Sequence, residues 1–205
     1  MKHKMSISKK AILLVLLVLT IDQASKIFIK LNFALGDHVE VFSWFQIFFV
    51  ENNGMAFGME IFGKLFLTLF RIVAVSGLIY FIYKLIKQGA RQGYILAVSL
   101  LLAGAAGNIF DSLFYGLLFS ESYGMAATFL PETGGYAPLF YGKVVDMLYF
   151  PIIKNSAGET LFFSPVFNIA DSAISIAVGI ILIFFRKDLN DSLETKKPEN
   201  KENAI

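Results

Sequence analysis

The sequence predicts an all-α membrane protein with four transmembrane helices and a small β element on the outer (periplasmic) membrane surface. Hydrophobic residues make up 56% of the 205 positions, whereas soluble domains are ordinarily about 45–50% apolar. Several segments are long and apolar enough to cross a bilayer, and basic residues gather near one set of their ends. These features together predict a single compact membrane domain.

The predicted spans follow from length and hydropathy. A helix needs about 20 mostly apolar residues to cross the hydrocarbon core. Four segments meet this requirement: 11–29, 65–86, 94–114 and 166–185. We assign residues 1–187 to one transmembrane domain and expect the polar segment 188–205 to be a disordered tail. The N-terminal segment also resembles a secretory signal peptide, but it has no small-x-small cleavage site before Asp22.

The distribution of Lys and Arg predicts the orientation of these spans. Basic clusters precede the first span, separate the second from the third, and follow the fourth: Lys2, Lys4, Lys9 and Lys10; Lys84, Lys87 and Arg91; Arg186 and Lys187. All three clusters fall on one side if the spans alternate, and the positive-inside rule assigns that side to the cytoplasm. We therefore expect cytoplasmic termini and two outer loops, 30–64 and 115–165.

The first outer loop carries the predicted β element. Polar and apolar residues alternate over 39–47, although aromatic residues occur on both faces. The tripeptide Asn52-Asn53-Gly54 is a turn signal. This pattern predicts a short curved sheet or hairpin on the outer surface of the membrane.

Composition excludes several kinds of chemistry. The chain contains no Cys, which excludes disulfides, thiolate catalysis and Cys-ligated metals. The two His are His3, near the N-terminus, and His38, in a loop, so neither a His-based metal site nor a Ser-His triad is expected. A net charge of +2 gives no reason to expect a nucleic-acid partner. We expect no metal and no cofactor, and any hydrolysis must use carboxylates, Ser/Lys or Tyr.

Polar residues recur at helical spacing inside the predicted spans. An ionisable group in a membrane helix is costly and indicates function by default. Three spans carry such residues: Asp22 with Lys26, Asn108 with Asp111, and Asn168 with Asp171. Spacings of three or four residues place both members on one helix face. With alternating spans, all three sets fall towards the outer membrane boundary.

Two carboxylates at this boundary suit aspartic hydrolysis. Asp146 ends the second outer loop and has apolar neighbours on both sides, so we expect it at the membrane boundary rather than free in water. Two such acids cannot both ionise readily and share one proton. The ionised acid activates water, and the protonated acid donates to the carbonyl oxygen or to the leaving nitrogen. Nearby Asn amides can hold the substrate backbone.

Each of these residues also has a purely structural interpretation. Asp22 could pair with a lysine one turn later on the helix surface, and the two asparagines could hydrogen-bond between helices. Asp111 could brace the end of its helix, Asp171 could be a helix-start carboxylate, and Asp146 could be an ordinary loop acid. We interpret Arg71, inside the second span, as a bundle-facing or snorkelling cation, because that span contains no acid.

Two other classes of function fit this sequence less well. A proton- or ion-coupled transporter also places acids in membrane helices, but it predicts acids near the midplane, broken helices and repeated halves. This sequence shows no internal repeat, and its acids lie towards one end of the spans. An assembly factor without chemistry gives no reason for the Asn-x-x-Asp spacing to recur at one depth.

Five motifs, in order along the chain, resemble those of the lipoprotein signal peptidases, also called signal peptidase II. They are DQASK (22–26), NNGMAFG (52–58), GNIFD (107–111), VVDM (144–147) and FNIAD (167–171). The resemblance covers nearly the whole chain apart from the charged tail. It implies an aspartic endopeptidase that removes the signal peptide from diacylglyceryl-modified prolipoproteins, cleaving before the lipidated Cys.

The resemblance also implies a location, partners and residue roles. The enzyme would be a monomer in the bacterial cytoplasmic (inner) membrane, in contact with membrane lipids, with its active site at the outer face and globomycin as an inhibitor. Asp146 and Asp171 would be the catalytic pair. Substrate-binding and supporting roles would fall to Asn52, Asn108, Asn168, Asp22, Asp111, Lys26 and Gly54.

Two departures from the family pattern concern the grip on the substrate. The family commonly has Arg directly after GNxxD, where this chain has Ser112. A cation that holds the substrate backbone is then missing or supplied from elsewhere, and Lys143 is our candidate. The segment 115–141 is also longer than expected. We expect this insertion and Lys143 to pack back over the active site.

Overall fold

The computed structural model describes residues 5–53, 63–154, 160–162 and 165–194. Gly54, which the sequence placed in the site, lies outside these described residues, as does the rest of the NNGMAFG motif after Asn53.

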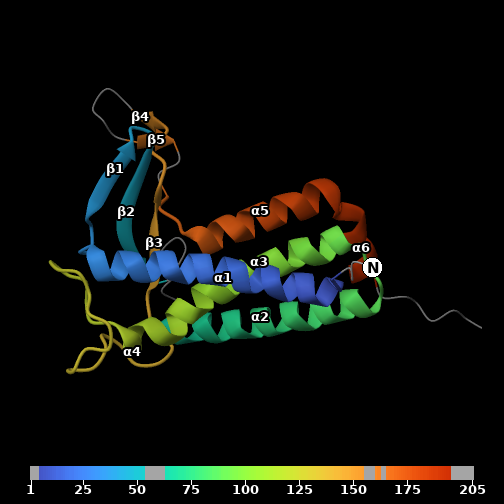
Figure 1. The fold of residues 1–205 in the computed structure, drawn as a ribbon, viewed down its shortest axis with the longest axis horizontal. Helices are drawn as coiled ribbons and strands as arrows, with labels where there is room; N and C mark the ends of the chain where they lie inside the picture. Colours follow the sequence, from blue (N-terminus) through green and yellow to red (C-terminus); the bar gives the residue numbers. More distant parts are fainter. Residues whose placement is uncertain (1–4, 54–62, 155–159, 163–164, 195–205) are drawn as a thin grey trace, which may run out of the picture.

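Four long helices lie side by side (Figure 1): α1 (Ile7–Asn32), α2 (Gly63–Lys87), α3 (Gln92–Phe110) and α5 (Ile169–Phe184). Helix α3 is central and packs against each of the other three. In the described part of the chain, three helices are long and apolar enough to cross a membrane. Helix α5 and the following α6 (Arg186–Leu193) are bent by 90° at Phe185 and give a fourth span if they are counted together. The first three spans contain the predicted segments 11–29, 65–86 and 94–114, whereas α5 begins three residues after the start of the fourth, 166–185.

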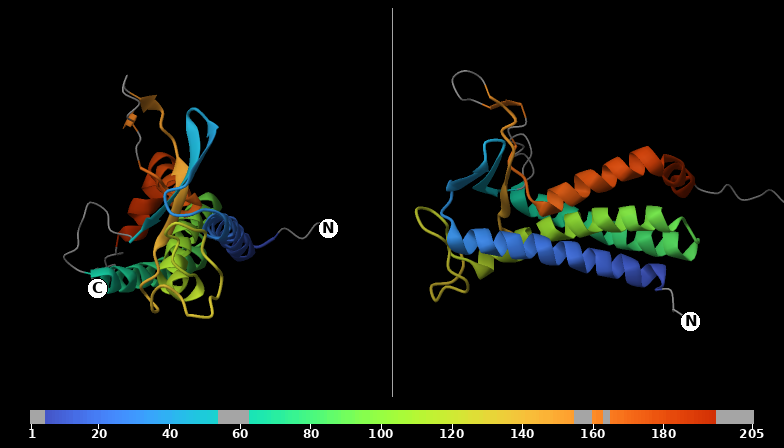
Figure 2. Two further views of the ribbon diagram at one scale, coloured as in Figure 1. Left: turned by 90° about the vertical axis from the view of Figure 1, so that its left-hand side faces the viewer. Right: turned by 45° about the horizontal axis from the view of Figure 1, so that its top comes forward.

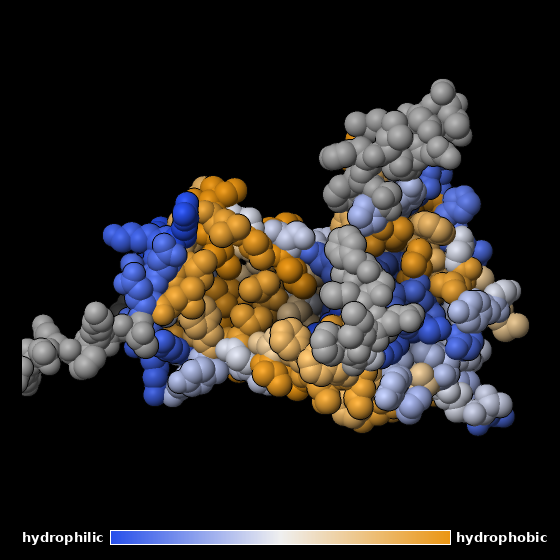
Figure 3. All heavy atoms as spheres, turned by 180° about the vertical axis from the view of Figure 1, so that it is seen from behind, coloured by the Kyte–Doolittle hydropathy of each residue, from blue (hydrophilic) through white to orange (hydrophobic). Residues whose placement is uncertain are grey.

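The surface of the helices is that of a membrane protein. Apolar atoms cover the middle of the bundle, and hydrophilic residues gather at both ends (Figure 3). Large apolar side chains point outward; Val73 on α2 is 69% exposed and Ile183 on α5 is 73% exposed. Exposed apolar area of this extent is costly in water and favourable against lipid. The chain is therefore a multi-pass membrane protein.

Helix α3 does not end regularly. It continues through a π-helical turn, η3 (Asp111–Tyr115), into the short α4 (Gly116–Leu118). Asp111, Ser112 and Tyr115 in this turn are buried. A π-helical turn inside an α-helix commonly marks a functional position, and this one begins at Asp111, the last residue of the GNIFD motif.

A three-stranded antiparallel sheet stands at the end of the bundle remote from the N-terminus (Figures 1 and 2). Its strands are β1 (His38–Phe42), β2 (Phe45–Asn52) and β3 (Val144–Tyr149), in that order. A separate pair is formed by β4 (Ile153–Lys154) and β5 (Thr160–Phe162). The predicted hairpin is confirmed, but strand β3 was not predicted.

The hairpin turn lies earlier than the sequence indicated. Phe42 pairs with Phe45, so Ser43 and Trp44 form the turn, whereas Asn52 ends strand β2. The ring of Trp44 stacks on that of Phe42 with their centroids 5.4 Å apart. Aromatic packing across the turn favours this register.

Residues 186–193 correct the prediction of a disordered tail from residue 188. They form α6, which is held against the turn between α2 and α3. Tyr94 and Ser192 hydrogen-bond through their hydroxyl groups at 3.1 Å, and Arg91 forms a 3.1 Å ion pair with Asp188. The side chain of Leu189 packs on the apolar core near this end. Residues 195–205 lie outside the described part.

Candidate active site

Asp146 and Asp171 reach one place through backbone pairing. Asp146 lies in the middle of β3, and Asp171 lies in the first turn of α5. The segment entering α5 pairs with β3: the N–H of Leu148 donates to the carbonyl of Phe167 at 2.7 Å, and Phe167 donates back at 3.0 Å. This bridge fixes the start of α5 beside the strand that carries Asp146.

Two asparagines connect the two acids. Asn168 donates through Nδ2 to Asp146 Oδ1 at 2.7 Å and to Asn108 Oδ1 at 3.1 Å. Asn108 donates through Nδ2 to Asp171 Oδ1 at 2.7 Å. The two carboxylates thus belong to one hydrogen-bonded chain of four side chains, drawn from β3, α3 and α5.

The local sequence of FNIAD explains the position of Asp171. Asn168 is the N-cap of α5, and its side-chain oxygen accepts from the N–H of Asp171 at 2.9 Å. Asp171 returns the contact by accepting from the N–H of Asn168 at 3.4 Å. This reciprocal capping box fixes both side chains at the helix start. Asn168 therefore caps its own helix with its oxygen and holds Asp146 with its nitrogen.

The environment of Asp146 favours its protonated form. Asp146 is 3% exposed, whereas Asp171 is partly exposed. Burial, followed by the neighbouring Asp171 carboxylate, raises the pKa of Asp146 to about 7, and the hydrogen bonds from Asn168 and Asn52 oppose this rise. When one carboxyl group is buried and its neighbour is nearer the surface, the two can share one proton, with one group acting as acid and the other as base.

Asn52 joins the site from the sheet. It pairs with Val144 across the β2–β3 ladder and donates through Nδ2 to Asp146 Oδ2 at 3.4 Å. The antiparallel register of β2 and β3 therefore brings the first predicted asparagine to the second outer loop's acid, although 94 positions separate them in the sequence.

Lys26, Asp22 and Asp111 form a fully buried triad beneath the site. Lys26 Nζ lies 2.9 Å from Asp22 Oδ2 and 2.8 Å from Asp111 Oδ2, and all three side chains have 0% exposure. The predicted pairing of Asp22 with Lys26 is present, but in the interior rather than on the helix surface. Lys26 also donates to Asn108 Oδ1 at 3.0 Å. The triad thus connects to the asparagine that holds Asp171.

Each acid of the triad also holds backbone next to a candidate catalytic residue. Asp22 Oδ1 accepts from the N–H of Ala170 at 2.9 Å, and Asp111 Oδ2 accepts from the N–H of Val145 at 3.3 Å. These residues directly precede Asp171 and Asp146. Gln23, which the sequence did not single out, donates to both acids at 3.1 and 2.8 Å. Its place in the DQASK motif was the available signal.

Lys143 forms its ion pairs with residues other than the predicted catalytic acids, and its role in substrate grip stays a prediction. Its Nζ forms ion pairs with Glu51 at 3.0 Å and Glu121 at 3.2 Å. Glu51 also pairs with the buried Lys30 at 2.6 Å. Lys143 therefore ties Glu121, in the segment 115–141, to Glu51 on strand β2.

Arg71 is a second cation near the site, besides Lys26. It lies in α2, and its Nη1 donates to Ser112 Oγ at 3.2 Å, so it faces the bundle. The carboxylates of Asp171, Asp111 and Asp146 all attract its charge. An arginine in an apolar helix indicates a functional residue, but the sequence did not indicate which helix this arginine faces.

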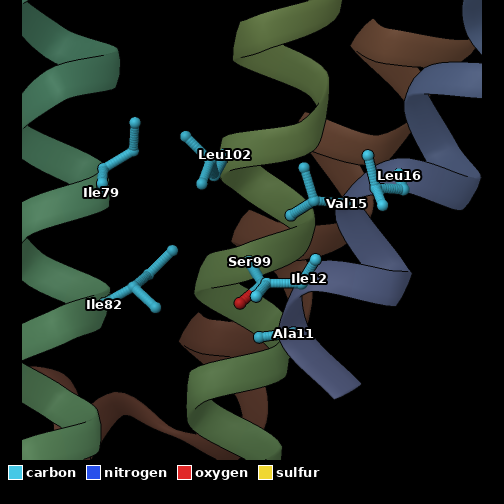
Figure 4. Close-up of a pocket in the computed structure, with 8 residues that line it drawn as sticks. All are labelled: Ala11, Ile12, Val15, Leu16, Ile79, Ile82, Ser99 and Leu102. Carbon is cyan, nitrogen blue, oxygen red and sulfur yellow. The ribbon is translucent and has the colours of Figure 1, made fainter. Parts of the chain in front are cut away.

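Two other features of the described residues bear on where chemistry could occur. Across the described ranges, no three His, Cys, Asp or Glu side chains converge as metal ligands. A cavity of about 220 Å³ lies between α1, α2 and α3 (Figure 4). Its lining is apolar except for Ser99: Ala11, Ile12, Val15, Leu16, Ile79, Ile82 and Leu102. It offers no group for chemistry.

The chain is similar to known proteins in sequence and in fold. The family model described as "Signal peptidase (SPase) II" matches residues 14–187. The lipoprotein signal peptidase of Porphyromonas gingivalis is 45% identical over 194 residues, which cover 90% of this chain and 86% of the relative. That of Amoebophilus asiaticus is 33% identical, covering 87% and 78%. A solved bacterial membrane enzyme superposes with a TM-score of 0.64 at 29% identity, covering 92% of this chain and 99% of that one.

Proposed function

Because the chain belongs to the signal peptidase II family, we propose that it cleaves by aspartic chemistry and that Asp146 and Asp171 are its catalytic pair. The family relationship makes the chain a peptidase that removes signal peptides from prolipoproteins. It gives no support to the alternative of a proton- or ion-coupled transporter. The observation that carries the catalytic assignment is the hydrogen-bonded chain Asp146–Asn168–Asn108–Asp171.

The geometry supports a general acid–base mechanism. Asp146 is buried and has a raised pKa, so it is suited to act as the protonated general acid. The more exposed Asp171 is suited to act as the general base that takes a proton from water. The activated water attacks the scissile carbonyl carbon, while Asp146 donates its proton to the carbonyl oxygen. The C–N bond then breaks as the proton held by Asp171 passes to the leaving nitrogen, and a hydroxyl of the intermediate returns its proton to Asp146 as the carbonyl reforms. Both acids regain their starting states.

The surrounding residues keep the pair in register. Asn108 and Asn168 space the carboxylates, Asn52 holds Asp146 from the sheet, and the buried triad pins the backbone that precedes each acid. Such support matters because catalytic groups displaced by about 1 Å can lose on the order of 10²-fold in rate.

We further propose the setting in which this chemistry occurs. The basic residues of the α2–α3 turn and of α6 lie at the end of the bundle opposite the sheet (Figure 1). The positive-inside rule then places the acids at the outer face of the cytoplasmic membrane. The substrate is a prolipoprotein whose Cys carries diacylglycerol, the enzyme acts as a monomer among lipids, and globomycin competes at the same site. Residues 1–187 form the catalytic domain.

Cleavage by the purified protein tests the proposal. A prolipoprotein carrying diacylglyceryl-Cys should be cut immediately before that Cys, the same chain with unmodified Cys should be cut far more slowly, and globomycin should block cleavage. Asp146→Asn and Asp171→Asn should fold and lose activity. Asp188→Asn is the matched control, because Asp188 pairs with Arg91 on α6 at the other end of the bundle. Normal turnover by either site variant removes that residue from the mechanism.

A further inference from the structure

A second cluster of charged side chains is centred on Glu51 of strand β2. Its Oε1 lies 2.6 Å from Lys30 Nζ, and its Oε2 lies 3.0 Å from Lys143 Nζ. Lys30 comes from the last turn of α1, and Lys143 directly precedes β3. The side chain of Lys30 is 0% exposed and that of Glu51 is 3% exposed. One buried carboxylate therefore connects α1, β2 and the start of β3.

This carboxylate lies next to Asp146 in the strand ladder. Glu51 stands between Val50, which pairs with Asp146 across the ladder, and Asn52, whose Nδ2 donates to Asp146. The ladder is irregular between positions 47 and 50. An irregularity of this kind disrupts the strand pairing locally, so the pairing before position 50 fixes the last part of β2 less firmly. A shift of β2 against β3 at Glu51 would move both of these neighbours of Asp146.

Tyr136, from the segment 115–141, completes the cluster. Its hydroxyl accepts from the backbone N–H of Lys143 at 2.6 Å. Its ring centroid lies 5.0 Å from Lys30 Nζ and 5.0 Å from Lys143 Nζ, a distance at which an ammonium group is attracted to an aromatic face. Ser122, from the same segment, accepts from Lys30 Nζ at 2.8 Å. The segment thus contacts both of the lysines that hold Glu51.

We propose that Glu51 and Tyr136 are positioning residues for Asp146. Together they fix the start of β3 against β2 and α1, and they set the place of the Asp146 carboxyl group through Lys143 and the strand ladder. The segment 115–141 then supports the catalytic strand, which accounts for a buried Lys30 that is costly to desolvate. The inference rests on the proposed catalytic pair, because it concerns how one member of that pair is held.

Two variants disturb this support in different ways. Tyr136→Phe removes the acceptor of the Lys143 N–H and keeps the aromatic ring. Lys30→Met/Glu51→Gln removes both buried charges together, so that neither is left without its partner, and Lys143 keeps its ion pair with Glu121 at 3.2 Å. The fold is therefore expected to survive both changes, and unfolding temperatures in detergent check this.

The first measurement is the kinetics of cleavage of lipidated prolipoprotein. Each variant should lower kcat by roughly 10-fold and leave KM within about twofold of wild type, because a small displacement of a catalytic group weakens the transition state and not substrate binding. Tyr80→Phe is the matched control, since Tyr80 lies on α2 and is 68% exposed. It should match wild type in both constants.

The second measurement repeats the two variants in Asp146→Asn. A change that acts through Asp146 cannot lower the rate further once position 146 carries no carboxyl group, whereas a general loss of folded enzyme lowers both backgrounds by the same factor. We expect no further loss. Equal losses in the two backgrounds, or a wild-type kcat in Tyr136→Phe, overturn the proposal; if Lys30→Met/Glu51→Gln does not fold, Tyr136→Phe decides alone. Asp146→Asn by itself tests the proposed function: wild-type cleavage by it refutes the catalytic pair, and this inference with it.

Discussion

Gly104 sets the distance between α3 and α5, and therefore between Asn108 and Asp171. A Cβ atom at position 104 would lie 2.3 Å from the carbonyl oxygen of Ala170 and 2.7 Å from the Ile174 side chain, whereas ordinary contacts begin at 3.4 Å. We therefore expect Gly104→Ala to push the start of α5 away by about 1 Å. Overpacking of this kind costs about 1–3 kcal/mol, and a 1 Å shift of a catalytic group costs on the order of 10²-fold in rate.

The assay for this prediction is cleavage of lipidated prolipoprotein together with thermal unfolding in detergent. Gly77→Ala and Gly179→Ala are the matched controls, because each also lies in a helix and an added Cβ there has no neighbour within 4 Å. They should cleave like wild type and be no less stable. If Gly104→Ala retains both wild-type rate and wild-type unfolding temperature, close α3–α5 packing does not position the acids.

Three further predictions follow from charge and burial. The folded state raises the pKa of Asp146 to about 7, so protonation of Asp146 stabilises the fold. This stabilisation is complete below about pH 4 and is lost as the pH rises through 7. The unfolding temperature of wild type should therefore fall between these pH values, whereas that of Asp146→Asn should not. Glu51→Gln should lower the free energy of unfolding by about 3–5 kcal/mol, because it leaves the fully buried Lys30 without its anion. Arg91→Gln, at an exposed ion pair, should lower it by at most about 1 kcal/mol. Chemical unfolding of both variants measures the difference. A reporter inserted near Gly134 should face the exterior and one fused to the C-terminus the cytoplasm, and the opposite result would place the acids on the wrong side for secreted substrates.

Helical periodicity was the most informative signal in the sequence. The spacing of Asn108 with Asp111, and of Asn168 with Asp171, predicted residues that share a helix face, and the structure brings both pairs together with Asp22. The spacing is informative because polar groups in apolar membrane helices are costly unless they contact one another. The span ends differed by a few residues, since hydropathy changes gradually where a helix leaves the membrane.

Features that depend on tertiary pairing were missed. Strand β3 was not predicted because the side chains of residues 144–147 are all buried, so no polar–apolar alternation appears in the sequence. The ion pairs of Lys143 with Glu51 and Glu121 were also not predicted, because they join segments far apart in the sequence. The contact between Arg71 and Ser112 joins two helices, and nothing local in either motif indicates it.

The central claim is that Asp146 and Asp171 act as one unit, and the most direct test is the double variant. We predict that Asp146→Asn and Asp171→Asn each lower the cleavage rate by about 10²–10⁴-fold, and that Asp146→Asn/Asp171→Asn is little slower than either single variant, because either change already abolishes the shared proton. Independent losses that multiply in the double variant, with all three proteins folded, would contradict the account, since the two acids would then contribute separately.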